Sequence, residues 1–179
     1  MRVAVAVTFV AAALGTVSVT LVSNAALKKI VPWMLLAVAG YTLLSPRLGS
    51  HVRQARLTIL PFALLCGSAL GFYDGFFGPG AGSFWTIACI TLLGLELTRA
   101  TAFTKVVNLA SNLAALLIFA LAGRVRYDYG AVMIVGQLAG ERIGAGLVVR
   151  HGAPFIRVVF LAVVFAMVTK LLWDQWHPG

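Results

Sequence analysis

The sequence predicts an all-α protein, a polytopic transmembrane helical bundle with a broken glycine-rich helix and an internal repeat. The first observation is composition: 61% of the residues are hydrophobic and the mean hydropathy is +0.98, whereas soluble domains contain about 45–50% apolar residues. The second is that short basic clusters separate long apolar segments. The chain is therefore expected to be an integral membrane protein that lies in a lipid bilayer.

The apolar segments are candidates for membrane crossings, each of which needs about 20 residues. In chain order they are Val3–Val22, Ile30–Leu44, Leu57–Tyr73, Ser83–Leu95, Ala100–Ala122, Gly130–Val149 and Phe155–Leu172. The first could also be a signal peptide, with Arg2 before it and Ser23-Asn24-Ala25 as a cleavage site. A membrane span is the preferred interpretation, because the run is long for a signal peptide.

The net charge of +9 raises the question of nucleic-acid binding. The basic residues nevertheless gather between the apolar segments, at Lys28/Lys29, Arg47/Arg53/Arg56, Arg124/Arg126 and Arg150/Arg157. Such clusters are typical of loops that set membrane topology. We therefore expect no nucleic-acid partner.

An internal repeat relates two parts of the chain. Residues 13–44 and 138–172 each contain a small-residue helix, a basic turn and an apolar helix that ends in a Leu-Leu pair, so that Gly15 pairs with Gly140 and Lys28 with Arg157. Duplicated transporters leave such similarity. We expect residues 1–50 to be the tail of a first repeat, with two spans, and residues 51–179 to be a complete second repeat.

The segment Leu57–Leu95 is too long for one straight crossing, since its roughly 58 Å as a helix exceeds the hydrocarbon core of about 30 Å. Gly78-Pro79-Gly80 is the place where it should break. If the segment enters and leaves on one side, or crosses twice, more loop Lys and Arg lie on the side that holds Arg2. The charge distribution therefore favours an even number of crossings.

The helix expected at Ala100–Ala122 has one polar face, made of Thr101, Thr104, Lys105, Asn108, Ser111 and Asn112. At 100° per residue these side chains fall within about a third of the circumference. A lysine in a spanning helix costs at least about 2.5 kcal/mol and normally faces a cavity or the bundle interior. The face suits an anion. The alternative is that the polar groups join helices and Lys105 extends to the interface.

The glycine-rich turn offers a second anion-binding element. Main-chain N–H groups of Gly78–Gly82 at the start of a half-helix could bind an anion, or the turn could be a structural kink. Asp74 could pair with Lys105, which is the preferred interpretation, or carry a proton. Tyr73 could contribute its hydroxyl to the site or serve as an interface anchor.

Other features have simpler interpretations. Two glycine ladders with a spacing of four residues, Gly67/Gly71/Gly75 and Gly136/Gly140/Gly144, predict close helix packing. Glu141 and Arg142 predict a buried charge pair. Cys66 and Cys89 read as small core residues, because no metal-binding spacing surrounds them.

No motif of a soluble enzyme is present, since the chain lacks HExxH, a GKS/T sequence after the glycines and GxSxG. His51, His151 and His177 are its only histidines, too few for a metal-dependent intramembrane hydrolase. We expect no enzymatic activity, no cofactor and no metal.

Two sequence blocks carry a resemblance. Residues 71–84, GFYDGFFGPGAGSF, followed by residues 99–112, RATAFTKVVNLASN, resemble the second-half signature of the TauE/SafE family of sulfite exporters, and the match extends over about residues 50–175. The resemblance implies a multi-pass permease of the bacterial inner membrane, built from two related halves, that exports sulfite or other small sulfur-containing or organic anions. It also implies proton coupling, for which Asp74 is the candidate.

The chain departs from the family because it opens inside the first half. A misassigned start, a truncated gene or function as a homo-oligomer would each explain this. The leading hypothesis is a secondary transporter for a small anion, sulfite or an organosulfonate; the alternative is a truncated, non-transporting membrane protein or assembly partner.

We expect the turn Gly78–Gly82 to lie at bilayer depth, in contact range of the polar face on 101–112. The predicted substrate-binding residues are Lys105, Asn108, Thr104, Thr101, Asn112, Gly78, Gly80, Gly82, Asp74 and Tyr73.

Overall fold

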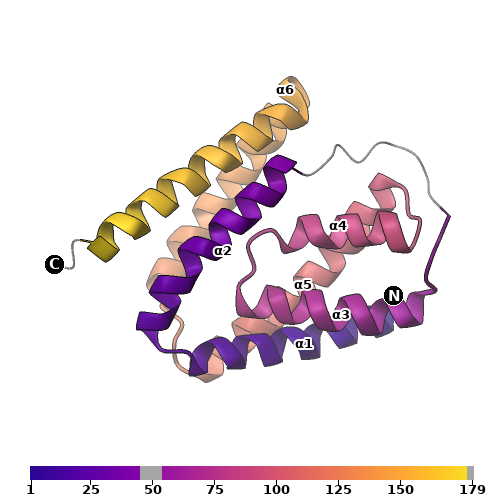
Figure 1. Ribbon diagram of the computed structural model, residues 1–179, viewed down its shortest axis with the longest axis horizontal. Coiled ribbons are helices and arrows are strands. Elements are labelled where there is room, and N and C mark those ends of the chain that lie inside the picture. The colour runs from indigo at the N-terminus through magenta and orange to yellow at the C-terminus, as the bar shows by residue number, and fades with distance from the viewer. Residues whose placement is uncertain (45–53, 177–179) are drawn as a thin grey trace. The chain divides into compact units, whose positions relative to one another are not determined.

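The computed structural model describes residues 1–44 and 54–176, and in these residues the chain is helical without a strand. The predicted all-α class is therefore confirmed. Figure 1 shows the helices, which are α1 (Arg2–Leu21), α2 (Asn24–Leu44), α3 (Ile59–Phe76), α4 (Ala81–Leu92), α5 (Leu97–Leu121) and α6 (Tyr127–Trp176).

The helices form two compact units. The first contains α1, α3, α4 and α5, and the second contains α2 and α6. Each unit combines a segment from before residue 50 with segments from after it. The repeat boundary at residue 50 remains a prediction, because the units do not follow the order of the chain.

In the first unit, α1 and α3 run parallel with their backbones almost in contact. A Cβ on Gly75 would lie 2.0 Å from the main-chain oxygen of Ala12, and a Cβ on Gly15 would lie 2.2 Å from that of Phe72. Real Cβ atoms do not come so close to main-chain oxygens, so only glycine fits at these positions. The packing role predicted for the ladder Gly67/Gly71/Gly75 is therefore confirmed.

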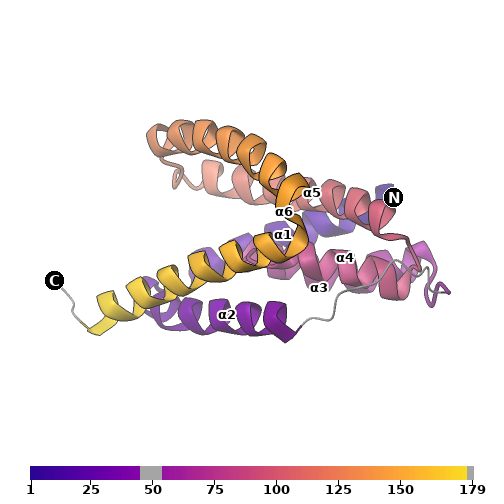
Figure 2. The same cartoon turned by 90° about the horizontal axis from the view of Figure 1, so that it is seen from above.

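The helices α3 and α4 form a hairpin, and Figures 1 and 2 show them side by side. The turn contains Gly78 and Gly80, whose φ angles of 86° and 83° lie in the left-handed region that favours glycine. At the other end, the main-chain N–H of Leu57 donates to the oxygen of Leu92 at 2.9 Å. The break is confirmed, and the segment Leu57–Leu95 returns to the end at which it began.

An aromatic cluster holds the hairpin against α5. The ring of Phe62 on α3 lies 6.1 Å from that of Trp85 on α4 and 6.0 Å from that of Phe103 on α5. Cys89 is fully buried in this cluster and Cys66 packs beside it. Both cysteines are free, which confirms their interpretation as core residues.

Outside, the first unit is covered by large apolar side chains. Leu21 and Leu121 are 82% and 85% exposed, while Ala4 and Ala12 are fully buried. Small residues inside and large apolar residues outside suit a bundle that packs in lipid. Among residues 1–44 and 54–176, three helices, α1, α3 and α5, are long and apolar enough to cross a membrane.

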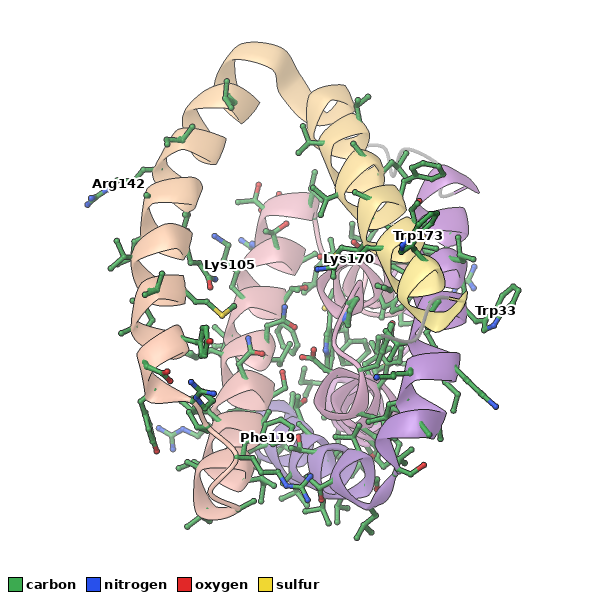
Figure 3. All side chains as sticks on the ribbon, turned by 90° about the vertical axis from the view of Figure 1, so that its left-hand side faces the viewer. Trp33, Lys105, Phe119, Arg142, Lys170 and Trp173 are labelled. Carbon is green, nitrogen blue, oxygen red and sulfur yellow. The ribbon has the colours of Figure 1, made fainter. Side chains whose placement is uncertain are left out.

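In the second unit, α2 packs against α6 through buried Leu35, Val38, Val164 and Val168. Figure 3 shows that α6 folds back on itself, with Arg142 on one arm and Lys170 and Trp173 on the other. The two arms correspond in sequence to the segments predicted at residues 130–149 and 155–172, and their crossing of a membrane remains a prediction.

Two predictions for the first arm of α6 find no support within the second unit. No atom of that unit lies within 4 Å of a Cβ added at Gly136, Gly140 or Gly144, and the side chains of Glu141 and Arg142 are exposed. Close packing of this ladder and a buried pair of Glu141 with Arg142 therefore remain predictions.

Candidate substrate site at the helix break

The turn between α3 and α4 lies directly against the polar face of α5. A Cβ added at Gly82 would be 3.3 Å from the Asn108 side-chain nitrogen and 3.9 Å from the Thr104 methyl carbon. The predicted contact between the glycine-rich turn and the polar face is therefore confirmed. The depth of the turn in a bilayer remains a prediction.

The turn leaves only part of its main-chain donors available. The N–H of Gly78 donates to the Tyr73 oxygen at 3.2 Å and that of Ala81 donates to the Gly78 oxygen at 3.1 Å. For Gly80 and Gly82 no acceptor exists among residues 1–44 and 54–176. Of the N–H groups that were predicted to bind an anion at residues 78–82, these two at the start of α4 are therefore the ones without a protein acceptor.

The hydroxyl of Thr104 is committed to the protein. The Thr86 hydroxyl donates to the Gly82 oxygen at 2.8 Å and lies 3.2 Å from the Thr104 hydroxyl. Because a hydroxyl carries one proton, Thr104 is the donor of the second bond. Thr101 likewise donates to the Leu97 oxygen at 2.8 Å. Both threonine hydroxyls thus donate to protein oxygens in this structure, and their predicted role in anion binding remains a prediction.

Asp74 has a different partner from the predicted one. The Ser111 hydroxyl donates to its Oδ2, whereas Lys105 is exposed and forms no ion pair with Asp74 among the described residues. Ser111 and Lys105 point about 120° apart around α5 at 100° per residue. Since Ser111 faces α3, Lys105 cannot face it too, and the predicted Asp74–Lys105 pair is wrong.

Tyr73 joins the end of α3 to the turn. Its hydroxyl donates to the Pro79 oxygen at 2.5 Å, and its ring lies edge-on to those of Phe77 and Phe84, at 5.8 Å and 5.5 Å. The hydroxyl thus stabilises the turn, and the structure places Tyr73 at the predicted site as a support for the main chain.

The polar face of α5 divides into two edges. Thr104 and Ser111 are buried towards α3 and α4, while Lys105, which Figure 3 labels on α5, and Asn112 are exposed. Asn108 lies between them, and its buried Oδ1 accepts no hydrogen bond from the residues that the structure describes. Asn108 thus lies beside the turn, and Lys105 precedes it by three residues on the exposed edge of α5.

Two residues of this region were not among the predicted site residues. Ser111 belongs to the polar face but was left out of the set, and Thr86 was not considered. Thr86 lies four residues after Gly82, the spacing at which a helical hydroxyl reaches a preceding carbonyl. That spacing is the signal that could have identified it.

Comparison of this chain with known proteins identifies its family. The family described as "Sulfite exporter TauE/SafE" matches residues 1–171. The chain is 44% identical over 171 residues to "Probable membrane transporter protein YfcA" of Escherichia coli K12, covering 96% of this chain and 64% of that protein. It is 42% identical over 167 residues to a "Probable membrane transporter protein" of Haemophilus influenzae, covering 93% and 66%.

A third relative, "Probable membrane transporter protein ORF9" of a Sinorhizobium species, is 38% identical over 167 residues. The chain spans about two thirds of the length of the first relatives, 64–66%. No solved structure matches it. With a match over 171 residues and these identities, the chain belongs to the TauE/SafE family of sulfite exporters.

Proposed function

We propose that this chain acts in a secondary membrane transporter for a small anion, with sulfite or an organosulfonate as substrate, in the bacterial inner membrane. Membership of the sulfite exporter family and the names of the relatives support a transporter. The observation that supports this site most directly is the closeness of Gly82 to Asn108. A Cβ built on Gly82 would lie 3.3 Å from the side-chain nitrogen of Asn108. This closeness places unpaired main-chain donors beside a polar helix face.

The donors suit an anion. The N–H groups of Gly80 and Gly82 stand at the start of α4, where the helix dipole favours negative charge. The Asn108 amide adds a side-chain donor, and Lys105 supplies the only positive charge on the polar face of α5. Asn112 and Thr101 extend this face, and Tyr73 holds the turn through Pro79.

The length of α4 supports a position within the bilayer. Its 12 residues correspond to about 18 Å of helix, less than the hydrocarbon core of about 30 Å. A half-helix whose start points at the substrate near the midplane is common in transporters with repeats. The hairpin therefore favours a site at membrane depth.

Uptake of labelled sulfite into proteoliposomes tests the proposal. We expect Lys105→Ala to lower the initial flux by about tenfold or more, equivalent to about 1.4 kcal/mol of lost stabilisation. Lys170→Ala on the other unit, which removes another exposed lysine, should leave the flux unchanged. Equal flux in both variants would remove Lys105 from the site, and absence of flux in the folded parent protein would refute transport by the chain alone.

The substrate class needs its own measurement. Competition by unlabelled sulfite, methanesulfonate and acetate ranks the three anion classes against each other, because selectivity is a difference of affinities. We expect the two sulfur oxyanions to compete more strongly than acetate. Equal competition by acetate would overturn the sulfur-anion assignment while leaving anion transport intact.

A second candidate is a truncated, non-transporting membrane protein or an assembly partner of another chain. It is favoured by the coverage of only 64–66% of the relatives' length. Reconstitution of the chain alone would then give folded protein without flux, and flux would appear only when a partner is reconstituted with it. Flux from the monomer, sized in the same detergent, would reject this candidate.

A further inference from the structure

The Ser111 hydroxyl stands between two acceptors from different parts of the site. It contacts Oδ2 of Asp74 on α3, and it lies 3.0 Å from the main-chain oxygen of Asn108 on its own helix. Ser111 is only 1% exposed. Because a serine hydroxyl has a single proton, it can donate to only one of the two acceptors at a time.

This arrangement satisfies both protonation states of Asp74. When the carboxylate is ionised, Ser111 donates to Oδ2. When the carboxyl is protonated, its O–H donates to the Ser111 oxygen, and the Ser111 proton turns to the Asn108 carbonyl. Leaving a buried donor without an acceptor costs about 1–3 kcal/mol, and neither state incurs that cost.

Charged groups on the surrounding helices do not neutralise Asp74. Within the described residues they form no ion pair with it. Glu96 and Arg99 pair with each other at the exposed start of α5, and Tyr73 donates to Pro79. The remaining titratable groups of α1, α3, α4 and α5 are Arg2, Cys66, Cys89 and Lys105. An unpaired carboxylate in a membrane segment is costly and is usually functional.

We infer that Asp74 and Ser111 form a proton-binding switch whose state is transmitted to Asn108. A proton from water binds to the Asp74 carboxylate, and the Ser111 hydroxyl then rotates from Asp74 to the Asn108 carbonyl. Asn108 is also the residue whose side chain lies against Gly82. Ser111 is thus a positioning residue that couples the charge of Asp74 to the turn, and its use in transport rests on the proposed function.

Infrared difference spectra of the full chain in liposomes, recorded as a function of pH, test the switch without any substrate. We expect a protonated-carboxyl C=O band that grows on acidification and is absent from Asp74→Asn. In Ser111→Ala the band should shift in frequency and titrate with a different midpoint, because its hydrogen-bond partner is gone. Ser111→Thr, which keeps the hydroxyl, should restore the parental band.

Thr16→Val is the matched control. The Thr16 hydroxyl is also buried and lies within hydrogen-bond distance of two main-chain oxygens, that of Ala12 at 2.9 Å and that of Gly75, next to Asp74, at 3.0 Å, but it does not contact the carboxyl. Its removal should leave the frequency and midpoint of the band unchanged. A spectrum without a band lost in Asp74→Asn, or the same band in Ser111→Ala and the parent protein, would overturn the inference.

Flux measurements separate this inference from the proposed function. With an imposed pH gradient, we expect anion flux of the parent protein to follow the gradient and that of Asp74→Asn to be independent of it. The expected infrared bands without anion flux would support the switch and refute transport. Anion flux with no dependence on the gradient, together with no Asp74 band, would support transport and refute the switch.

Discussion

The two glycine ladders have the same spacing and opposite surroundings. In Gly67/Gly71/Gly75 on α3, each added Cβ would meet an α1 atom at 3.0 Å or less, whereas in Gly136/Gly140/Gly144 on α6 it would meet nothing within 4 Å. The difference lies in the facing helix, since α1 presents Thr8 and Ala12 to the first ladder. Spacing therefore identifies a face that permits close approach, but the opposing helix decides whether close approach occurs.

The largest expected effect comes from Gly75→Ala. Its Cβ would lie 2.0 Å from a main-chain oxygen that cannot move without displacing α1, so we expect a loss of about 3 kcal/mol or more, seen as loss of the monodisperse peak in size-exclusion chromatography. Gly67→Ala is the matched control, because its Cβ would meet the Val7 side chain at 3.0 Å, which can adjust. Equal behaviour of the two variants would contradict the close contact at Gly75.

A smaller loss of stability is expected from Gly78→Ala. Glycine is required at this position by its backbone conformation and not by a close neighbouring atom. Its added Cβ would be 3.4 Å from the nearest atom, but its φ is +86°, which costs a residue with a side chain about 1–2 kcal/mol. Thermal unfolding in detergent should show this loss, and Gly78→Asn should lose less because asparagine tolerates the left-handed region. A larger loss for asparagine than for alanine would show that space also matters there.

Gly140→Ala should be neutral or stabilising. Without a neighbour within 4 Å, the substitution removes only the low helix propensity of glycine and should raise stability by about 0.5–1 kcal/mol. Thermal unfolding of this variant beside Gly75→Ala measures the contrast between the ladders directly. Destabilisation by Gly140→Ala would mean that a backbone does pack against the second ladder.

The smallest effect concerns the start of α6. Arg126 donates to both oxygens of Asp128, at 3.1 Å and 2.7 Å, which lowers the pKa of Asp128. A lowered pKa gives stability that is present above the unfolded-state pKa and lost as the pH falls through the folded-state value. Because both side chains are exposed, we expect Asp128→Asn to leave the unfolding temperature at neutral pH almost unchanged.

Much of the fold could be predicted from the sequence, because helices in lipid are set by local apolar runs and by glycine and proline. The break at Gly78–Gly80 and the contact of the turn with α5 followed from such local signals. The partner of Asp74 did not. Lys105 and Ser111 both lie on one polar face, and their orientation towards α3 depends on the rotation of α5, which is set by packing of Phe103 against Phe62 and Trp85.

The side-chain hydroxyls at the turn donate to protein acceptors. The hydrogen-bond donors that remain at the start of α4 are therefore the main-chain N–H groups of Gly80 and Gly82. Every amino acid except proline carries a main-chain N–H, so an exchange of side chains other than one to proline leaves these donors in place. Relatives that share this hairpin could therefore differ widely in side chains and still present identical donors. Selectivity for the anion would then depend on the curvature of the turn. Directed evolution of selectivity would act on residues that stabilise this curvature, such as Tyr73 and Thr86.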